Sequence, residues 1–444
     1  MRHASDRLAV SGPRGELSYA ELARDVQGAA RHLLGQGVGR GALVAVGLAD
    51  PVAQITAVLA ADLVGATPLL CDPAWDEGRR SRVMAAIPVD ARVDAPLPTP
   101  HGPPVRGQAA PGDRAWACFG SGSTGRPRAV VRTRASWTDS FPHLGDLAGI
   151  GAGDVVLVPG PLVSSLYGFA AVHALATGAA VVVPGRRPSA RDLAAHLRRC
   201  TVIHLVPHML PAVLEVLRET GGPLRTAVVG GAATMAGSRD LAAESGVGVV
   251  SYYGATELSF VAVDTDGTGL RPFPRTEIEV RGQGLGEVWV RSPWLAEGYL
   301  AGAPGPLRAD GDGWMTVGDV AEPYRPGEVL RLRGRGDGAI QTGGATVLPE
   351  DVEEVLRKVP GVGDLVVVGS PHPLLGSVVT AVIEGEGASR ASLEAMARGG
   401  LDAAQRPRRW YAVPALPRTP TGKPARGLVA ARLADGDPDM RRLA

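Results

Sequence analysis

The chain has 444 residues, enough to bury a large core and to form two or three domains. Its 46 lysines and arginines balance 45 aspartates and glutamates, so no overall field would hold it on nucleic acid or on an anionic membrane. We therefore expect a small molecule rather than nucleic acid as its partner, and no apolar run approaches the ~20 residues of a membrane span.

The three cysteines and the first fifteen residues bear on the cellular compartment of the protein. Cys71, Cys118 and Cys200 lie far apart in the sequence and lack metal-ligand spacing. Residues Met1–Gly15 are polar and lack the apolar core of a signal peptide. We expect a reducing, cytoplasmic environment.

The first hundred residues alternate between helix and strand patterns. Ser18 is expected to cap a helix that reaches about Leu34, with Glu21 three residues later completing a capping box. A strand at 42–47, a helix at 52–63 and a strand at 66–70 are expected next. This alternation predicts a parallel sheet covered by helices.

The same alternation returns after residue 150, so we expect two doubly wound α/β subdomains. The expected strands are 155–158, 180–183, 202–206 and 226–229, and the expected helices are 167–176, 190–198 and 211–220. Between the two halves, the Pro- and Gly-rich residues 95–114 indicate a surface connection. From Glu277 onward, short strands such as Glu287–Val290 indicate a small β-rich subdomain.

The last hundred residues form a separate pattern after the glycine- and charge-rich Gly334–Gly344. Helices at 349–358 and 393–404 and strands at 365–368 and 378–383 predict a small α+β domain. We place the boundary so that a large N-terminal domain covers 1–335 and a small, mobile C-terminal domain covers 336–444.

The residues Gly120–Arg128, with the sequence GSGSTGRPR, follow the apolar strand pattern Ala115–Phe119. Glycines let backbone N–H groups approach phosphate oxygens and three hydroxyls add donors, so the segment fits a polyphosphate. No Gly-Lys-Ser/Thr follows at the spacing of the common P-loop. A flexible Gly/Ser linker is the competing interpretation, and the other motifs have to decide between the two.

A second segment, Tyr252–Glu257 (YYGATE), follows the apolar strand pattern Val247–Val250. An aromatic ring beside a glycine can lie on an adenine, and a carboxylate can hold Mg²⁺ between phosphates. Taken alone, a surface turn with one acidic residue explains the segment equally well.

Three further elements follow in chain order. Gly318-Asp319 offers a carboxylate that can accept both hydroxyls of a ribose. Gly334–Asp337 (GRGD) precedes the helix pattern, and Pro417–Lys423 (PRTPTGK) lies near the C-terminus. A lysine on a mobile loop can neutralise charge that grows on the reacting oxygens. Each of these elements alone would be a turn or solvated surface.

These five elements, in this order across residues 120–423, resemble the superfamily of acyl-CoA synthetases, nonribosomal-peptide adenylation domains and luciferases, and Asp72–Trp75 extends the resemblance. The family form of the first element ends Pro-Lys-Gly, where this chain has Pro127-Arg128-Ala129, and Val317 replaces a threonine in the third. The resemblance implies that ATP and a carboxylic acid form acyl-AMP and pyrophosphate, and that the acyl group then passes to a thiol, with coenzyme A the expected acceptor.

The resemblance also implies roles for individual residues. Thr256, Glu257 and Lys423 are implied as catalytic, with Glu257 also a Mg²⁺ ligand, and Asp337 is implied as the hinge of the C-terminal domain. Gly343-Gly344 resembles the second face that this domain presents. The implied ATP-binding residues are Ser121, Gly122, Ser123, Thr124, Gly125, Arg128, Gly231, Ala232, Ala233, Tyr253, Gly254, Asp319 and Arg335.

The identity of the acid is addressed by residues 160–169. In relatives that activate amino acids this region carries a carboxylate for the substrate ammonium, and here it has none, so a free amino acid is disfavoured. The pocket looks neutral and suits an aliphatic or aromatic carboxylate. The expected pocket residues are Ser164, Tyr167, Gly168, His208 and Gly230.

Two alternatives stay open. A ligase that transfers the acyl group to a carrier-protein phosphopantetheine or to an amine shares every motif on the ATP side. A non-catalytic adenylate-binding homologue would explain Arg128 in the place of lysine, although the retention of Glu257, Asp319 and Lys423 argues against it.

Overall fold

The computed structural model describes residues 5–119, 128–185, 189–231, 237–282, 284–335, 338, 340–342, 345–373, 375–385, 387–401, 403–419 and 422–443. The chain divides into two compact units. The first consists of most of the chain up to Ile278 together with Val290–Met315, and the second consists of Glu279–Trp289 and Thr316–Ala444.

A six-stranded sheet lies in the N-terminal part of the first unit. Across the sheet, the strands are β17 (Gly298–Tyr299), β7 (Ala129–Thr133), β6 (Arg114–Phe119), β4 (Thr67–Leu70), β3 (Leu43–Val46) and β5 (Ala91–Val93). Strands β5, β3, β4 and β6 are parallel neighbours, and β7 and β17 join the sheet antiparallel. Helices α1 (Tyr19–Gly35), α2 (Pro51–Leu63) and α3 (Glu77–Ala86) belong to this region.

The expected start of α1 is confirmed. Glu21 N donates to Ser18 Oγ at 3.2 Å, and Ser18 N donates in return to Glu21 Oε2 at 2.7 Å. This reciprocal capping satisfies two backbone N–H groups that the first helical turn would otherwise leave without acceptors.

A nine-stranded sheet forms the second half of the first unit. Its strands, in spatial order, are β14 (Arg271–Pro272), β13 (Ser259–Asp264), β12 (Gly248–Ala255), β11 (Thr226–Gly230), β10 (Val202–Leu205), β8 (Val155–Leu157), β9 (Ala180–Val182), β1 (Leu8–Gly12) and β2 (Gly15–Ser18). Strands β12, β11, β10, β8, β9 and β1 run parallel to one another, whereas β13, β14 and β2 join the sheet antiparallel. The helices are α4 (Arg134–Thr138), α5 (Phe141–Ala148), α6 (Ser165–Thr177), α7 (Ala190–Leu197), η1 (Pro207–Met209), α8 (Leu210–Thr220) and α9 (Ser238–Glu244).

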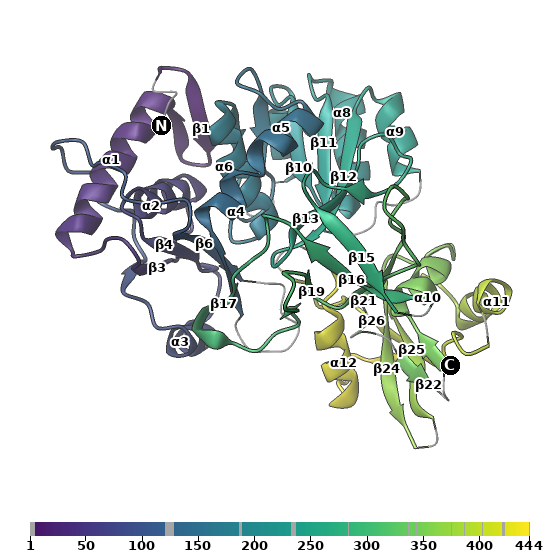
Figure 1. The fold of residues 1–444 in the computed structure, drawn as a ribbon. Helices are drawn as coiled ribbons and strands as arrows, with labels where there is room; N and C mark the ends of the chain where they lie inside the picture. Colours follow the sequence, from purple (N-terminus) through teal and green to yellow (C-terminus); the bar gives the residue numbers. More distant parts are fainter. Residues whose placement is uncertain are drawn as a thin grey trace. The chain divides into compact units, whose positions relative to one another are not determined.

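These helices cover opposite faces of the nine-stranded sheet, because successive residues of a strand point to opposite faces and pack with different helices. Ile203 and Leu205 on β10 pack in one cluster with residues of α7, α8 and α9, whereas Val202 packs in the other cluster with α5 and α6. Figure 1 shows β10, β11 and β12 beside one another with α8 and α9 next to them. Because both faces are covered, the inner strands are mostly apolar, as expected for a parallel sheet.

Residues 277–335 form a small sheet of short strands. Its order is β18 (Arg308–Ala309), β19 (Met315–Thr316), β16 (Gly286–Arg291), β20 (Asp319–Ala321) and β21 (Leu332–Arg335), with β15 (Glu277–Arg281) paired to β16. A short 3-10 helix, η2 (Leu300–Gly302), precedes β18.

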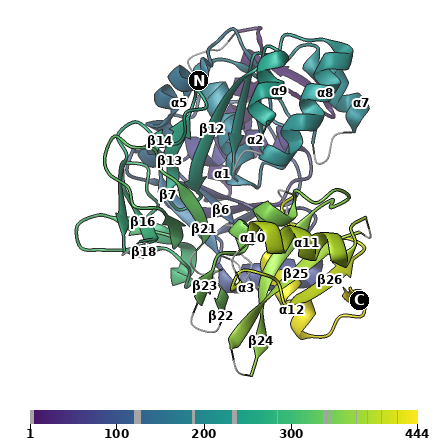
Figure 2. The same ribbon diagram turned by 90° about the vertical axis from the view of Figure 1, so that its right-hand side faces the viewer.

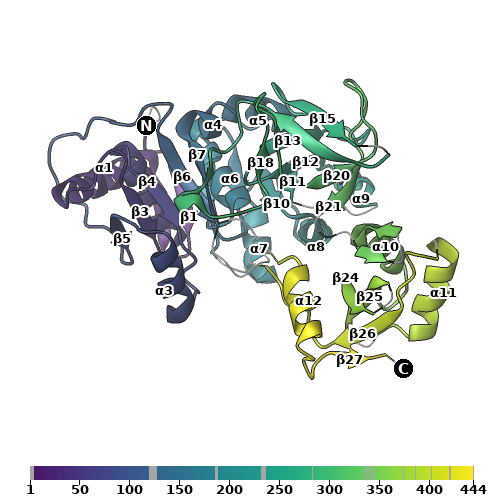
Figure 3. The same cartoon turned by 60° about the horizontal axis from the view of Figure 1, so that its bottom comes forward.

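The C-terminal part of the second unit is a sheet with helices on both faces. Its strands are β23 (Ala345–Val347), β22 (Ile340–Thr342), β25 (Gly376–Glu384), β26 (Arg409–Val413) and β27 (Arg441–Arg442), with β24 (Leu365–His372) also paired to β25. Its helices are α10 (Pro349–Leu356), α11 (Arg390–Gly400) and α12 (Arg426–Ala434). Val367 packs with α10 and α11, and Val366 and Val368 pack with α12. Figure 2 shows α10 and α11 side by side, and Figure 3 shows α11 and α12 on opposite sides of β25 and β26.

The predicted α/β class, with its large N-terminal and small C-terminal parts, is confirmed. The boundary between 335 and 336 stays a prediction. Several elements were missed, among them β1 in the polar-looking start, whose Ala9 and Val10 are fully buried. Within the described part of the chain, no helix is both long and apolar enough to cross a membrane. The three cysteines are free and buried.

Candidate active site

The glycine-rich segment connects two antiparallel strands of the first unit. Phe119 at the end of β6 pairs with Ala129 at the start of β7, so the segment links two neighbouring antiparallel strands. The predicted phosphate-binding residues Ser121, Gly122, Ser123, Thr124 and Gly125 lie outside the described residues.

Tyr253 and Gly254 lie within a strand, which corrects the sequence interpretation. The strand was expected to end at Val250, but β12 continues to Ala255 and forms a hairpin with β13. A Cβ at Gly254 would lie 2.0 Å from the carbonyl oxygen of Ser259, so only glycine fits where the two strands approach this closely.

Thr256 and Glu257 occupy the tip of this hairpin, between β12 and β13. The hydroxyls of Thr256 and Ser165 are 2.9 Å apart, and Ser165 is the first residue of α6. The hairpin tip is therefore held against the beginning of α6 by a side-chain hydrogen bond.

The Glu257 carboxylate is held by a tyrosine that the sequence did not single out. The Tyr299 hydroxyl donates to Glu257 Oε1 at 2.9 Å and itself accepts a hydrogen bond from Leu307 N at 3.3 Å. Glu257 is 8% exposed, and Ala296 N donates to its backbone oxygen at 2.9 Å. A buried carboxylate with one oxygen fixed in this way presents a defined geometry for its other oxygen.

Burial raises the pKa of Tyr299, and the negative charge of Glu257 raises it further. The half-buried Arg128 acts on this pKa in the opposite sense, so its positive charge lies close enough to influence the pair. Tyr299 therefore stays protonated and remains a hydrogen-bond donor to Glu257 at neutral pH.

Strand β11 ends at Gly230 beside the same hairpin, as β11 and β12 are parallel neighbours. A Cβ at Gly230 would lie 2.2 Å from the Tyr252 ring, so this glycine makes room for an aromatic side chain of β12. Gly231 follows with a φ of +90°, a value that favours glycine. Ala232 and Ala233 lie outside the described residues.

Three of the five residues expected to line an acyl pocket lie at the start of α6. Ser164 is its N-cap residue, Tyr167 is 1% exposed, and Gly168 lies so close to Trp116 that a Cβ would be 2.4 Å from the indole. His208 lies in η1 and is exposed. Their roles as pocket walls stay a prediction.

The Tyr167 side chain packs into the turn that precedes α6. A Cβ at Gly160 would lie 1.9 Å from the Tyr167 ring, and the Tyr167 hydroxyl donates to Met209 Sδ at 3.6 Å. Burial raises the pKa of this hydroxyl.

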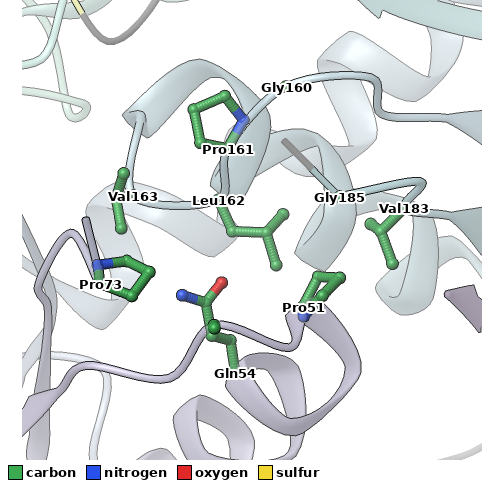
Figure 4. A pocket seen from close by; sticks show the side chains of 10 residues that line it. Pro51, Gln54, Pro73, Gly160, Pro161, Leu162, Val163, Val183 and Gly185 are labelled. Atoms are coloured by element: carbon green, nitrogen blue, oxygen red, sulfur yellow. The ribbon is translucent and has the colours of Figure 1, made fainter. Parts of the chain in front are cut away.

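Beside this turn lies a small pocket with about 20 Å³ of free volume, room for one or two water molecules. Figure 4 shows the Gln54 side chain pointing into it between Pro51 and Pro73, with Leu162 opposite. This pocket contains none of the predicted acyl-pocket residues, although Gly160–Val163 immediately precede Ser164.

The remaining predicted residues belong to the second unit. Asp319 begins β20 and is 9% exposed, and its backbone pairs with that of Arg335 on β21. Asp337, Gly343 and Gly344 lie outside the described residues.

Lys423 is described and half-buried, and its backbone is fixed by Thr419. Lys423 N donates to Thr419 Oγ1 at 3.2 Å, and Thr419 N donates to the Lys423 carbonyl at 2.7 Å. Thr419 therefore holds the Lys423 backbone through two hydrogen bonds, and the catalytic role of the lysine stays a prediction.

Two neighbours of the hairpin tip, Ser165 and Tyr299, were not predicted as site residues. No spacing in the sequence could have identified them, because Ser165 is 91 residues from Thr256 and Tyr299 is 42 residues from Glu257. Within the described ranges, no three His, Cys, Asp or Glu side chains converge as a metal site.

The family of AMP-binding enzymes matches residues 1–96 and 89–300, and the C-terminal domain of AMP-binding enzymes matches residues 351–423. The chain is 32% identical over 328 residues to YhfT, an uncharacterised acyl–CoA ligase of Bacillus subtilis, across 70% of this chain and 67% of that protein.

Two solved structures have the same fold. The o-succinylbenzoate CoA synthetase MenE of Bacillus subtilis, in complex with an acyl-adenylate intermediate, has a TM-score of 0.85 over 99% of this chain and 96% of that one; at 22% identity this likeness shows the fold alone. The amide bond synthetase McbA of Marinactinospora thermotolerans has a TM-score of 0.82 at 26% identity and covers 97% of each chain.

Proposed function

Because the chain belongs to the family of AMP-binding enzymes, we propose that it is an AMP-forming acid–thiol ligase whose hairpin tip, Thr256 and Glu257, works at the phosphates of ATP. A carboxylic acid is activated as acyl-AMP with release of pyrophosphate, and the acyl group then passes to the thiol of coenzyme A. The observation that carries this assignment is the hairpin tip itself: a hydroxyl and a buried carboxylate fixed side by side by Ser165 and Tyr299.

In the first step, a carboxylate oxygen of the acid attacks the α-phosphorus of ATP and pyrophosphate leaves. The Thr256 hydroxyl donates to an α-phosphate oxygen, and the Tyr253 ring lies against the adenine. The carboxylate of Asp319 accepts the ribose hydroxyls. The protein supplies position and charge, and no side-chain nucleophile is needed.

Glu257 has the chemistry that Mg²⁺ requires, since its carboxylate is a hard oxygen ligand and Tyr299 occupies only one of its two oxygens. Mg²⁺ commonly binds through one or two carboxylates together with substrate phosphates, and it would neutralise phosphate charge here. Glu257 would therefore share the ion with the phosphate oxygens of ATP.

Lys423 neutralises the charge that develops on the carboxylate and α-phosphate oxygens during attack. In the second step the thiol attacks the carbonyl carbon of acyl-AMP and AMP leaves, after the C-terminal domain has turned about Asp337. Lys423→Ala should therefore abolish adenylation and spare thioester formation from supplied acyl-AMP. Equal loss of both steps would contradict this division of labour.

An amine acceptor is a second candidate, favoured by the 26% identity to an amide bond synthetase across 97% of both chains. Pyrophosphate release should be measured with acetate, butyrate, octanoate, benzoate and phenylacetate, each alone, with coenzyme A, and with a primary amine. A thioester product supports the leading proposal and an amide supports the second. ATP binding without pyrophosphate release for any acid would leave the non-catalytic homologue.

A further inference from the structure

Arg418 lies five residues before Lys423, at the start of the loop that carries the lysine. Its guanidinium contacts three acceptors: Nη1 donates to Asp364 Oδ2 at 3.0 Å and to the Gly422 carbonyl at 3.1 Å, and Nη2 donates to Glu384 Oε2 at 2.8 Å. The Arg418 side chain therefore links Gly422, the residue before Lys423, to two carboxylates outside the loop.

The two carboxylates form a fixed socket at one end of the C-terminal sheet. Asp364 directly precedes β24 and Glu384 ends β25, and Glu384 N donates to the Asp364 carbonyl at 2.8 Å. Glu384 Oε2 also accepts a hydrogen bond from Leu416 N at 2.9 Å. Two negative charges this close repel each other unless a cation neutralises them, and Arg418 supplies that cation.

Hydrogen bonds between the described residues on either side hold the Lys423 backbone. Arg418 and Pro424 form an antiparallel bridge, and Ala425 N donates to the Pro417 carbonyl at 2.7 Å. Thr419, next to Arg418, bonds both the N–H and the carbonyl of Lys423. The position of the Lys423 backbone thus depends on where Arg418 attaches the loop to the sheet.

We propose that Arg418 is a positioning residue for adenylation, which holds the Lys423 loop on the Asp364–Glu384 socket so that the lysine ammonium meets the reacting oxygens in a fixed geometry. This inference rests on the role given to Lys423 in the proposed function. Arg418 touches no reacting atom and acts only through the loop.

These contacts of Arg418 fix the geometry of the Lys423 loop and add little to the stability of the unit. The Arg418, Asp364 and Glu384 side chains are 36%, 25% and 28% exposed, and ion pairs of this exposure contribute about 0–1 kcal/mol to folding. A displacement of about 1 Å at a catalytic group, by contrast, can lower a rate roughly 100-fold. Lysine cannot replace this arginine, because a single ammonium lacks the planar fork that reaches three separate acceptors.

The test compares Arg418→Ala, Arg418→Lys, Lys423→Ala and the double variant, with Arg432→Ala as the matched control. Arg432 makes an ion pair with Asp437 at 3.1 Å in the same unit, away from the Lys423 loop. With the best acid of the panel above, the kcat of pyrophosphate release and the KM for ATP are measured, and thioester formation is measured from the corresponding acyl-AMP.

For Arg418→Ala we expect the kcat of adenylation to fall about 10- to 100-fold, with the KM for ATP and the thioester step within about twofold of wild type. Arg418→Lys should recover little of the loss, and Arg432→Ala should match wild type. Any residual adenylation that remains in Lys423→Ala should fall by less than about twofold when Arg418→Ala is added, because the two residues act as one unit.

Three results would overturn the proposal: Arg418→Ala within twofold of wild type, independent losses that multiply in the double variant, or equal loss of both steps. If Arg418→Ala does not fold, Asp364→Asn combined with Glu384→Gln removes the socket charges and must give the same selective loss. Retained adenylation in Lys423→Ala would instead refute the role of Lys423 in the proposed function.

Discussion

Replacing Tyr299 by phenylalanine should impair adenylation without disturbing the fold. The change removes one hydroxyl, whose hydrogen bond to Glu257 Oε1 is 2.9 Å long, and keeps the ring, which packs where a Cβ of Gly305 would lie 2.2 Å away. A hydrogen bond to a charged group contributes about 1.5–3 kcal/mol, and about 1.4 kcal/mol corresponds to a tenfold change in rate. If the bond serves to orient the carboxylate in the transition state, kcat falls roughly 10- to 100-fold.

The assay is the rate of acid-dependent pyrophosphate release over a range of Mg²⁺ concentrations. Tyr299→Phe should lower the maximal rate, raise the Mg²⁺ concentration needed for half of it, or both. Tyr324→Phe is the matched control, since it removes a hydroxyl that lies in the other unit and accepts a backbone hydrogen bond from Gly327. A Tyr299→Phe enzyme within twofold of wild type at every Mg²⁺ concentration would refute the idea that this hydroxyl positions Glu257.

Three other predictions concern the stability and local structure of the two units. Burial lowers the pKa of His173 to about 4 and that of His204 to about 3, and the charge of His173 lowers the pKa of His204 further. Below pH 6.5 the unfolded chain therefore binds more protons than the folded chain, so the free energy of unfolding falls as the pH falls. Urea unfolding should show roughly 4 kcal/mol less stability at pH 5 than at pH 7, and His204→Leu should reduce this loss. Gly254→Ala should distort the hairpin and abolish pyrophosphate release, whereas unchanged activity would mean that the strands separate freely. Glu353→Gln, which weakens the 2.8 Å contact with Arg426, should destabilise the C-terminal unit by about 2–4 kcal/mol, seen as faster amide exchange confined to that unit.

The sequence was sufficient for the parts of the molecule that local patterns encode. The Ser18–Glu21 capping box and the alternating strands and helices predicted the α/β class, since each depends on neighbours in the chain. The order of five motifs predicted the family, which the matches over residues 1–96, 89–300 and 351–423 confirm.

Contacts between distant segments could not be predicted from the sequence. Ser165 and Tyr299 reach the hairpin tip only because tertiary packing brings α6 and β17 to it. Strand β1 was missed because Leu8–Val10 is too short an apolar run to stand out, and it becomes a strand by pairing with β9. Likewise, β12 extends past Val250 because its partner β13 continues the pairing.

The central claim, attack of a carboxylate on the α-phosphorus of ATP, is tested most directly with an acid labelled with ¹⁸O in both carboxylate oxygens. One of these oxygens becomes the bridge of acyl-AMP and leaves with AMP when the thiol attacks the carbonyl carbon. We predict one ¹⁸O atom in each AMP formed and none in pyrophosphate. Label in pyrophosphate or inorganic phosphate, with unlabelled AMP, would contradict the account.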